Sequence, residues 1–109
     1  MQTKALLALS TCADKTVAKK IADTLVERRL AACVNILPNL SSVYEWQGKV
    51  ETAEEALLLI KTTESRYPDL EKALREIHPY ELPEIIAVTL DEGSPDYLRW
   101  ITASLEDVS

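Results

Sequence analysis

The chain has 109 residues, 47% of them hydrophobic and 28% charged, and its formal net charge is -6. This length fits one domain over residues 1–109, and the composition is that of a folded rather than a disordered protein. A nucleic-acid partner is not expected, because neutralising a phosphate backbone requires clustered lysine and arginine. Two cysteines are too few for a disulfide scaffold and favour reduced thiols in the cytoplasm.

The first segment, residues 4–12, is predicted to be a buried strand. Its apolar run is about half the length of the hydrophobic region of a secretion signal, so we expect a cytoplasmic protein. No run in the sequence is long enough to span a membrane. After the strand, Asp14 is placed to cap a helix whose apolar residues recur at helical spacing as far as Arg28 and Arg29, where cations favour a helix end.

The middle of the chain is predicted to be a β-hairpin. Residues 31–46 have the composition of a strand but contain Pro38, which implies an edge or a bulge. Gly48 supplies the positive φ that a tight turn requires. Residues 49–62 are ambiguous, because their Ala, Glu and Leu content favours a helix, whereas their place after a turn favours the second strand of a hairpin. We interpret them as a strand.

The last third of the chain is predicted to contain a helix, a strand and a second helix. Ser65 is expected to begin the first helix, with a proline in its first turn, and Pro79 to end it, because the residue before a proline is pushed out of the helical region. Residues 84–90 are predicted to form a buried strand. Ser94 and Pro95 are placed to cap and begin the final helix.

The predicted order is therefore β-α-β-β-α-β-α. Two βαβ halves around a hairpin are typical of the ferredoxin-like split-βαβ fold, an α+β fold with a four-stranded antiparallel sheet, helices on one face and, here, an extra C-terminal helix. This fold supports many functions and decides none of them. With two glycines and no G-x-S-x-G motif, the chain has no phosphate loop or dinucleotide fingerprint, so we do not expect an enzyme.

Five stretches of the sequence match one known family in both order and spacing. They are ERRLAACVNILP (27–38), SVYEWQGKVE (42–51), LLIKTTESRYPDLE (58–71), HPYELPEIIAV (78–88) and DYLRWI (96–101). Together they resemble the CutA family of divalent-cation tolerance proteins. The resemblance implies a fold shared with the PII signalling proteins and a homotrimer in which the long central strands pair between subunits. It also implies a role in copper and divalent-metal tolerance, with copper-type ions bound by cysteine and histidine.

His78, the only histidine, is the first candidate metal ligand. Neutral imidazole suits copper and zinc, and metal-binding members of the family have a histidine at the matching position. A second histidine, which such members can carry just before it, is replaced here by Ile77. The alternative is a residue at a helix end whose ring interacts with the last carbonyl groups.

Cys12 and Cys33 are the other candidate ligands. The family's cysteine at the end of the first strand corresponds to Ser10, and residues 10 and 12 share one face of a strand, so Cys12 offers a thiol one step along. Cys33 matches a cysteine of the family's second strand. The alternative for each is a small buried residue. Without CxxC or HxxxH spacing, a closed four-ligand site in one chain is not expected, which leaves a smaller copper site or one across a trimer interface.

Four further residues are candidates for a small-ligand cleft between subunits: Trp46, Lys61, Tyr80 and Glu84. The alternative is packing for the aromatic residues and an ion pair with a glutamate for Lys61. Three glutamates after the turn are interpreted as a solvated strand surface rather than a cation site: Glu51, Glu54 and Glu55.

Three functions follow. The first is a cytoplasmic homotrimer that binds copper and divalent cations and contributes to metal tolerance. The second is a PII-like signalling or adaptor module that senses a small ligand and binds a further, unidentified protein. The third is a mainly structural trimer with incidental ion binding.

Overall fold

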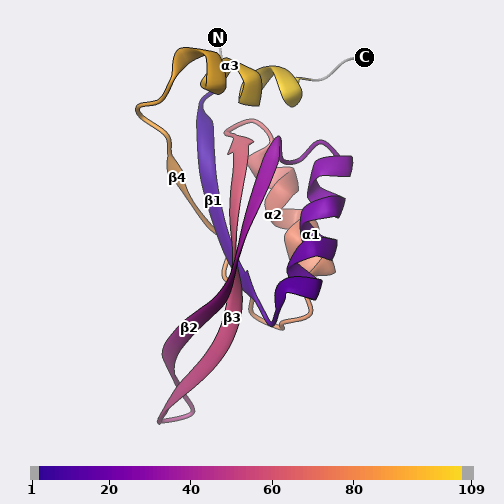
Figure 1. Ribbon diagram of the computed structural model, residues 1–109. Coiled ribbons are helices and arrows are strands. Elements are labelled where there is room, and N and C mark those ends of the chain that lie inside the picture. The colour runs from indigo at the N-terminus through magenta and orange to yellow at the C-terminus, as the bar shows by residue number, and fades with distance from the viewer. Residues whose placement is uncertain (1–2, 107–109) are drawn as a thin grey trace.

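The elements follow the predicted order β-α-β-β-α-β-α in the computed structural model, which describes residues 3–106 (Figure 1). Their bounds are, in chain order, β1 Ala5–Cys12, α1 Lys15–Glu27, β2 Cys33–Trp46, β3 Lys49–Thr63, α2 Tyr67–Ile77, β4 Ile86–Thr89 and α3 Pro95–Ser104. The ambiguous segment after the turn is strand β3, as predicted. Pairing on both of its edges overrides the helix propensity of its Ala, Glu and Leu residues.

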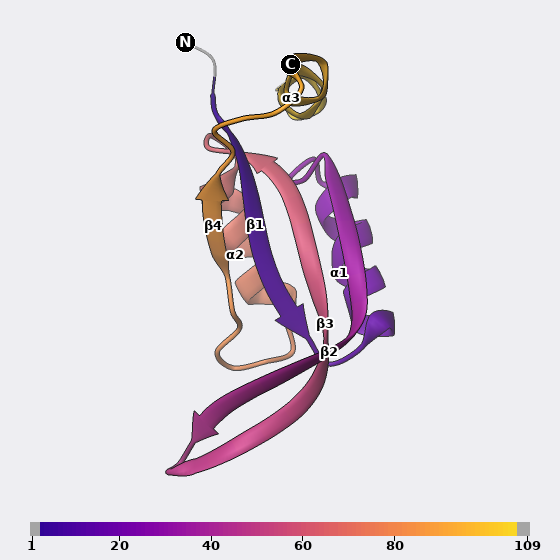
Figure 2. The ribbon, with the colours of Figure 1, turned by 60° about the vertical axis from the view of Figure 1, so that its left-hand side comes forward.

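The sheet has four strands in the order β2-β3-β1-β4, and each neighbouring pair is antiparallel. Helices α1 and α2 lie on one face of it, whereas α3 lies across the end where β1 begins (Figure 2). The predicted α+β fold and antiparallel sheet are therefore confirmed. None of the helices between residues 3 and 106 is long and apolar enough to cross a membrane.

The core lies between the sheet and the two helices α1 and α2. Alternate residues of β1 and β3 point toward these helices and are at most 1% exposed, and they are Ala8, Ser10, Cys12, Ala56, Leu58, Ile60 and Thr62. The helices contribute a matching apolar stripe at helical spacing, consisting of Ala18, Ile21, Ala22, Leu25, Leu70, Ala73 and Leu74. The apolar residues that recur every second position in the strands therefore pack against those that recur at helical spacing in α1 and α2.

The opposite side of the sheet, which we call the open face, is apolar but less covered. Its residues are half-buried on the central strands and exposed on β4, and they are Leu7, Leu9, Leu57, Leu59, Ile86 and Val88. The predicted buried strand at 84–90 is thus wrong in two respects. β4 spans only Ile86–Thr89, and as an edge strand with one uncovered face it leaves Ile86 52% and Val88 53% exposed.

The β2–β3 hairpin extends beyond the rest of the sheet, and we call residues 40–55 the arm. The arm begins at a register shift between Leu37 and Leu40, which confirms the bulge predicted at Pro38. It ends in a turn at Gln47 and Gly48, whose φ values are both positive, at 50° and 80°. The molecule measures 47 × 27 × 21 Å, and its radius of gyration of 14.7 Å exceeds the value of about 13 Å expected for a compact chain of this length.

The helix ends agree with the predictions at most positions. Asp14 caps α1 through a hydrogen bond from the backbone N–H of Val17 to its side chain, at 2.9 Å. His78 follows α2 with an extended backbone, as the proline after it requires. Ser94 occupies the cap position of α3, but its side chain makes no capping hydrogen bond.

The predicted start of α2 at Ser65 is wrong by two residues. The helix begins at Tyr67, and the residue at its cap position is Arg66. Ser65 instead belongs to a turn in which its hydroxyl lies 3.3 Å from that of Thr63, and its backbone N–H donates to Thr3 at 2.9 Å. The serine therefore joins β3 to the N-terminal segment rather than capping the helix.

Candidate site at the end of strand β1

His78 lies at the point where α2 ends and packs against the end of β1. Its side chain is buried, with a relative exposure of 6%. Its Nε2 atom lies 2.7 Å from the carbonyl oxygen of Thr11, and its Nδ1 atom lies 3.0 Å from the backbone nitrogen of Tyr80. Both ring nitrogens therefore have protein partners.

Tyr80 extends this set of contacts to β3. Its ring lies over that of His78, with centroids 4.7 Å apart and planes tilted by 56°, and its hydroxyl donates to Glu55 Oε2 at 2.8 Å. Glu55 is only 9% exposed, so the interpretation of this residue as part of a solvated strand surface is wrong. Glu55 pairs with Leu40, which places the contact at the base of the arm.

Cys12 and Cys33 lie on opposite faces of the sheet. Cys12 is fully buried on the helix side, where its thiol lies 3.5 Å from the carbonyl oxygen of Asp14. Burial raises the pKa of the Cys12 thiol above its ordinary value, so the protonated form is favoured. Cys33 is half-buried and pairs with Lys61 on the open face, near the hydroxyl of Tyr97.

The three predicted metal ligands are therefore not brought together in one chain. Within residues 3–106, no group of three or more His, Cys, Asp or Glu side chains is arranged to hold a metal ion. The imidazole of His78 is already engaged, the buried thiol of Cys12 has a raised pKa, and Cys33 is on the other face. These donors do not fit a copper ion held within a single subunit.

The predicted cleft residues are also separated within one chain. Trp46 pairs with Lys49 at the tip of the arm. Lys61 is further along β3, and the rise per residue of a strand puts it about 40 Å from Lys49. The Lys61 ammonium donates to the side chain of Asn35 rather than to a glutamate. Glu84 is exposed in the segment before β4. A cleft that contains all four candidates therefore requires more than one subunit.

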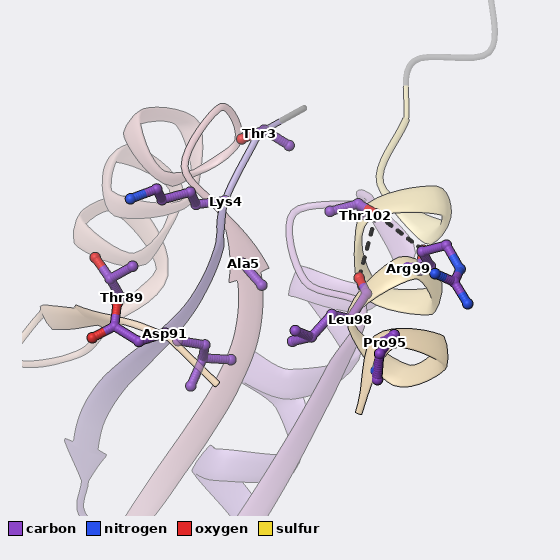
Figure 3. Close-up of a pocket in the computed structure, with 10 residues that line it drawn as sticks. Thr3, Lys4, Ala5, Thr89, Asp91, Pro95, Leu98, Arg99 and Thr102 are labelled. Atoms are coloured by element: carbon purple, nitrogen blue, oxygen red, sulfur yellow. Dashed lines mark hydrogen bonds between the residues drawn. The ribbon is translucent and has the colours of Figure 1, made fainter. Parts of the chain in front are cut away.

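A cavity of about 380 Å³ lies elsewhere, between α3 and the ends of β1 and β4. Figure 3 shows Ala5 and Leu98 in its middle, with the side chains of Lys4 and Arg99 directed to opposite sides. These two cations therefore do not converge on one point of the cavity. None of the predicted cleft residues lines it.

Comparison with known proteins decides the family. Residues 6–104 match the family described as CutA1 divalent ion tolerance protein. The chain belongs to the CutA1 family. It is 48% identical to Protein CutA of Mus musculus over 102 residues, which cover 94% of this chain and 58% of the mouse protein. It is 50% identical to the divalent-cation tolerance protein CutA of Thermus thermophilus over 93 residues, which cover 85% and 90% of the two chains.

Solved structures of CutA1 proteins share the fold closely. The Thermus thermophilus protein superposes with a TM-score of 0.91 at 45% identity, covering 94% of this chain and 99% of that one. The Oryza sativa CutA1 gives 0.94 at 38% identity, covering 97% of both chains. The chain spans between 57% and 60% of the length of its mouse, Xenopus laevis and human relatives.

Ser10 has a buried hydroxyl on the helix side of β1. It is fully buried, and its Oγ has no hydrogen-bond partner among the described residues. An unpaired buried hydroxyl costs stability, so we expect Ser10→Ala to raise the free energy of unfolding by about 1 kcal/mol. Urea unfolding followed by circular dichroism measures this change.

Thr62→Val is the matched control for Ser10→Ala. The hydroxyl of Thr62 is equally buried but donates to the carbonyl oxygen of Leu30 at 2.7 Å. Its removal should lower the free energy of unfolding by about 1 kcal/mol. Destabilisation by both substitutions would show that the Ser10 hydroxyl is paired in the protein.

Tyr80 gives the CutA1 chain an alkaline limit to its stability. Partial removal of Tyr80 from water, with 37% of it still exposed, and the hydrogen bond to Glu55 raise the pKa of Tyr80 to about 12, from an ordinary value near 10. Between these values the unfolded chain loses the phenolic proton and the folded chain keeps it, so folding stability falls as pH rises from about 10 to 12. Phenolate absorbance should show a tyrosine that titrates near pH 12, and this transition should be absent from Tyr80→Phe. If the highest tyrosine transition lies near pH 10 in both proteins, the assignment is contradicted.

Two members of this site were not predicted as members from the sequence. Glu55 lies among charged residues of an arm, and only its position beside the bulge distinguishes it from the exposed Glu54. Thr11 takes part through its backbone carbonyl, which no side-chain pattern reveals. The HPY motif, which places His78 and Tyr80 on either side of a proline, was the available signal.

Proposed function

We propose that this CutA1 chain, as one domain over residues 1–109, is a cytoplasmic homotrimer that binds copper and other divalent cations and contributes to metal-ion tolerance. Family membership supports the tolerance role, because relatives from Thermus thermophilus and Pectobacterium atrosepticum carry the name divalent-cation tolerance protein. No catalytic step belongs to this proposal. Relatives named as chloroplastic and periplasmic show that the location varies within the family.

The single observation that carries the assembly is the amount of apolar surface that one chain leaves uncovered. The open face exposes Ile86 and Val88, and the arm exposes further large apolar residues, namely Val43 at 68%, Tyr44 at 46%, Trp46 at 57% and Val50 at 76%. Many large apolar side chains left exposed on one face and along one hairpin indicate a surface that contacts another protein. A second and third copy of the chain supply the cover.

Ion binding is assigned to the assembled trimer rather than to one chain. Cys33 is the candidate ligand that lies on the open face, where neighbouring subunits can add donors, and soft thiolate suits copper. Cys12 and His78 lie on the helix side or are engaged in hydrogen bonds. The proposal therefore retains Cys33 and derives no further geometry for the ion.

Calorimetric titration tests this assignment. Copper binding to the wild-type protein should weaken at least tenfold in Cys33→Ser and stay unchanged in the control Cys12→Ser. Equal weak binding by all three proteins would contradict a specific site.

Light scattering on the same samples tests the assembly. The mass of a single chain at micromolar concentration would contradict the trimer. Unchanged copper sensitivity after deletion of the gene would favour a mainly structural trimer.

The PII-like alternative is favoured by one observation, the cavity beside α3. Its volume of about 380 Å³ lies within the range of small-molecule sites. Thermal-shift measurements with nucleotides, small carboxylates and metal ions separate the two functions. Stabilisation by an organic molecule, with no response to metal ions, would place the signalling function first.

A further inference from the structure

The partners of His78 fix its tautomer. A backbone carbonyl can only accept a hydrogen bond, so Nε2 must carry the proton that is shared with Thr11. A backbone N–H can only donate, so Nδ1 must offer its lone pair to Tyr80. We infer that His78 is a structural bridge in this neutral form, and that neither ring nitrogen is available to a metal ion while the bridge is intact.

The bridge continues through Tyr80 into the arm. The hydroxyl of Tyr80 reaches Glu55, which is in the first paired position of the arm beyond the bulge. We call His78 and Tyr80, with their partners Thr11 and Glu55, the latch. The latch joins the end of β1, the segment after α2 and the base of the arm (Figure 1).

The position of the latch determines what it holds. The ladder between β2 and β3 is interrupted beside Leu40, and interrupted pairing allows the two strands to bend there. Beyond that point the arm is connected to the rest of the chain mainly by the continuation of its two strands, β2 and β3, into the sheet. The hydrogen bond from Tyr80 to Glu55 adds a third support, so the latch fixes the direction of the arm.

A metal ion on His78 would have to break the latch. Coordination through Nδ1 removes the acceptor of the Tyr80 N–H, and coordination through Nε2 removes the donor to Thr11. Each change leaves a backbone group without its partner in a part-buried or buried place, which costs free energy. The structural role therefore competes with the ligand role that the family resemblance implies, and it does not rest on the proposed function.

Three substitutions separate the two hydrogen bonds of the latch. His78→Phe keeps a planar ring of similar size and removes both bonds. His78→Asn keeps an acceptor near the place of Nδ1, and His78→Gln keeps a donor near the place of Nε2. Amide hydrogen exchange at Tyr80, measured by NMR, should accelerate at least tenfold in His78→Phe and His78→Gln and stay within threefold of wild type in His78→Asn.

Metal titration of the same proteins completes the test. The affinity for Cu²⁺ and Zn²⁺ should differ by less than twofold between wild type and His78→Phe, and nitrogen NMR of the wild-type ring should show a proton on Nε2. A tenfold loss of affinity in His78→Phe, a proton on Nδ1, or unchanged Tyr80 exchange in every variant would overturn the latch. If wild type binds neither ion, the proposed metal binding fails, while exchange and ring NMR still decide the role of His78.

Discussion

Replacing Leu58 with alanine is expected to lower the free energy of unfolding by about 2–5 kcal/mol. Leu58 is fully buried on the helix side of β3, the strand that pairs with both β1 and β2. The loss of stability combines two terms: the burial free energy of the deleted atoms and the cost of the cavity that they leave. Denaturant unfolding at a fixed chain concentration measures it, because association adds to the apparent stability.

Leu82→Ala is the matched control for Leu58→Ala. The same atoms are deleted, but Leu82 is 84% exposed in the segment between α2 and β4. Its removal should change the free energy of unfolding by less than about 0.5 kcal/mol. A large loss at Leu82 would show that this side chain is buried against another subunit, and a small loss at Leu58 would contradict the core described above.

Placing a carboxylate on the open face is expected to dissociate the assembly. Ile86→Glu introduces a charge on β4 at a side chain that is 52% exposed in one chain, so the isolated fold tolerates it. In the proposed trimer the same position loses its water, at a cost of several kcal/mol for each unpaired carboxylate. Light scattering should therefore change from the mass of three chains to that of one at micromolar concentration.

Thr16→Glu is the control for this change in mass. It adds the same charge at an exposed position of α1, on the other side of the sheet. It should leave the assembly intact. A trimer that survives Ile86→Glu, or one that Thr16→Glu also dissociates, would show that the open face is not the contact between subunits.

Much of the fold could be predicted because the local signals agree with the global arrangement. Asp14 caps α1, Pro79 ends α2, and the bulge beside Pro38 lies in the expected strand. The need of a hairpin for a second strand correctly predicts a strand at residues 49–62, and this is a tertiary argument that helix propensity cannot supply. Local patterns that are consistent with one another are the signature of a foldable sequence.

The candidate site was less predictable, because it depends on contacts between distant segments. The sequence marks His78 as an available histidine, but its two hydrogen bonds involve a backbone carbonyl of β1 and an amide of the following segment. The burial of Glu55 likewise follows from the place of Tyr80. The apolar run at residues 84–90 predicted a buried strand, since composition does not show whether apolar residues are covered by helices or left on an open face.

The place of β1 between β3 and β4 has a consequence for synthesis of the chain. Within this domain β1 is synthesised before β3 and β4, the strands that pair with it, and Ala5 finds its partner only at Thr63. Pairing between strands that are distant in sequence slows folding, because the chain loses entropy in closing a long loop before the stabilising contacts form. The nascent segment therefore carries unpaired edges and apolar side chains until β3 emerges, a state in which strands tend to aggregate. The local β2–β3 hairpin can form earlier and provide the template onto which β1 docks.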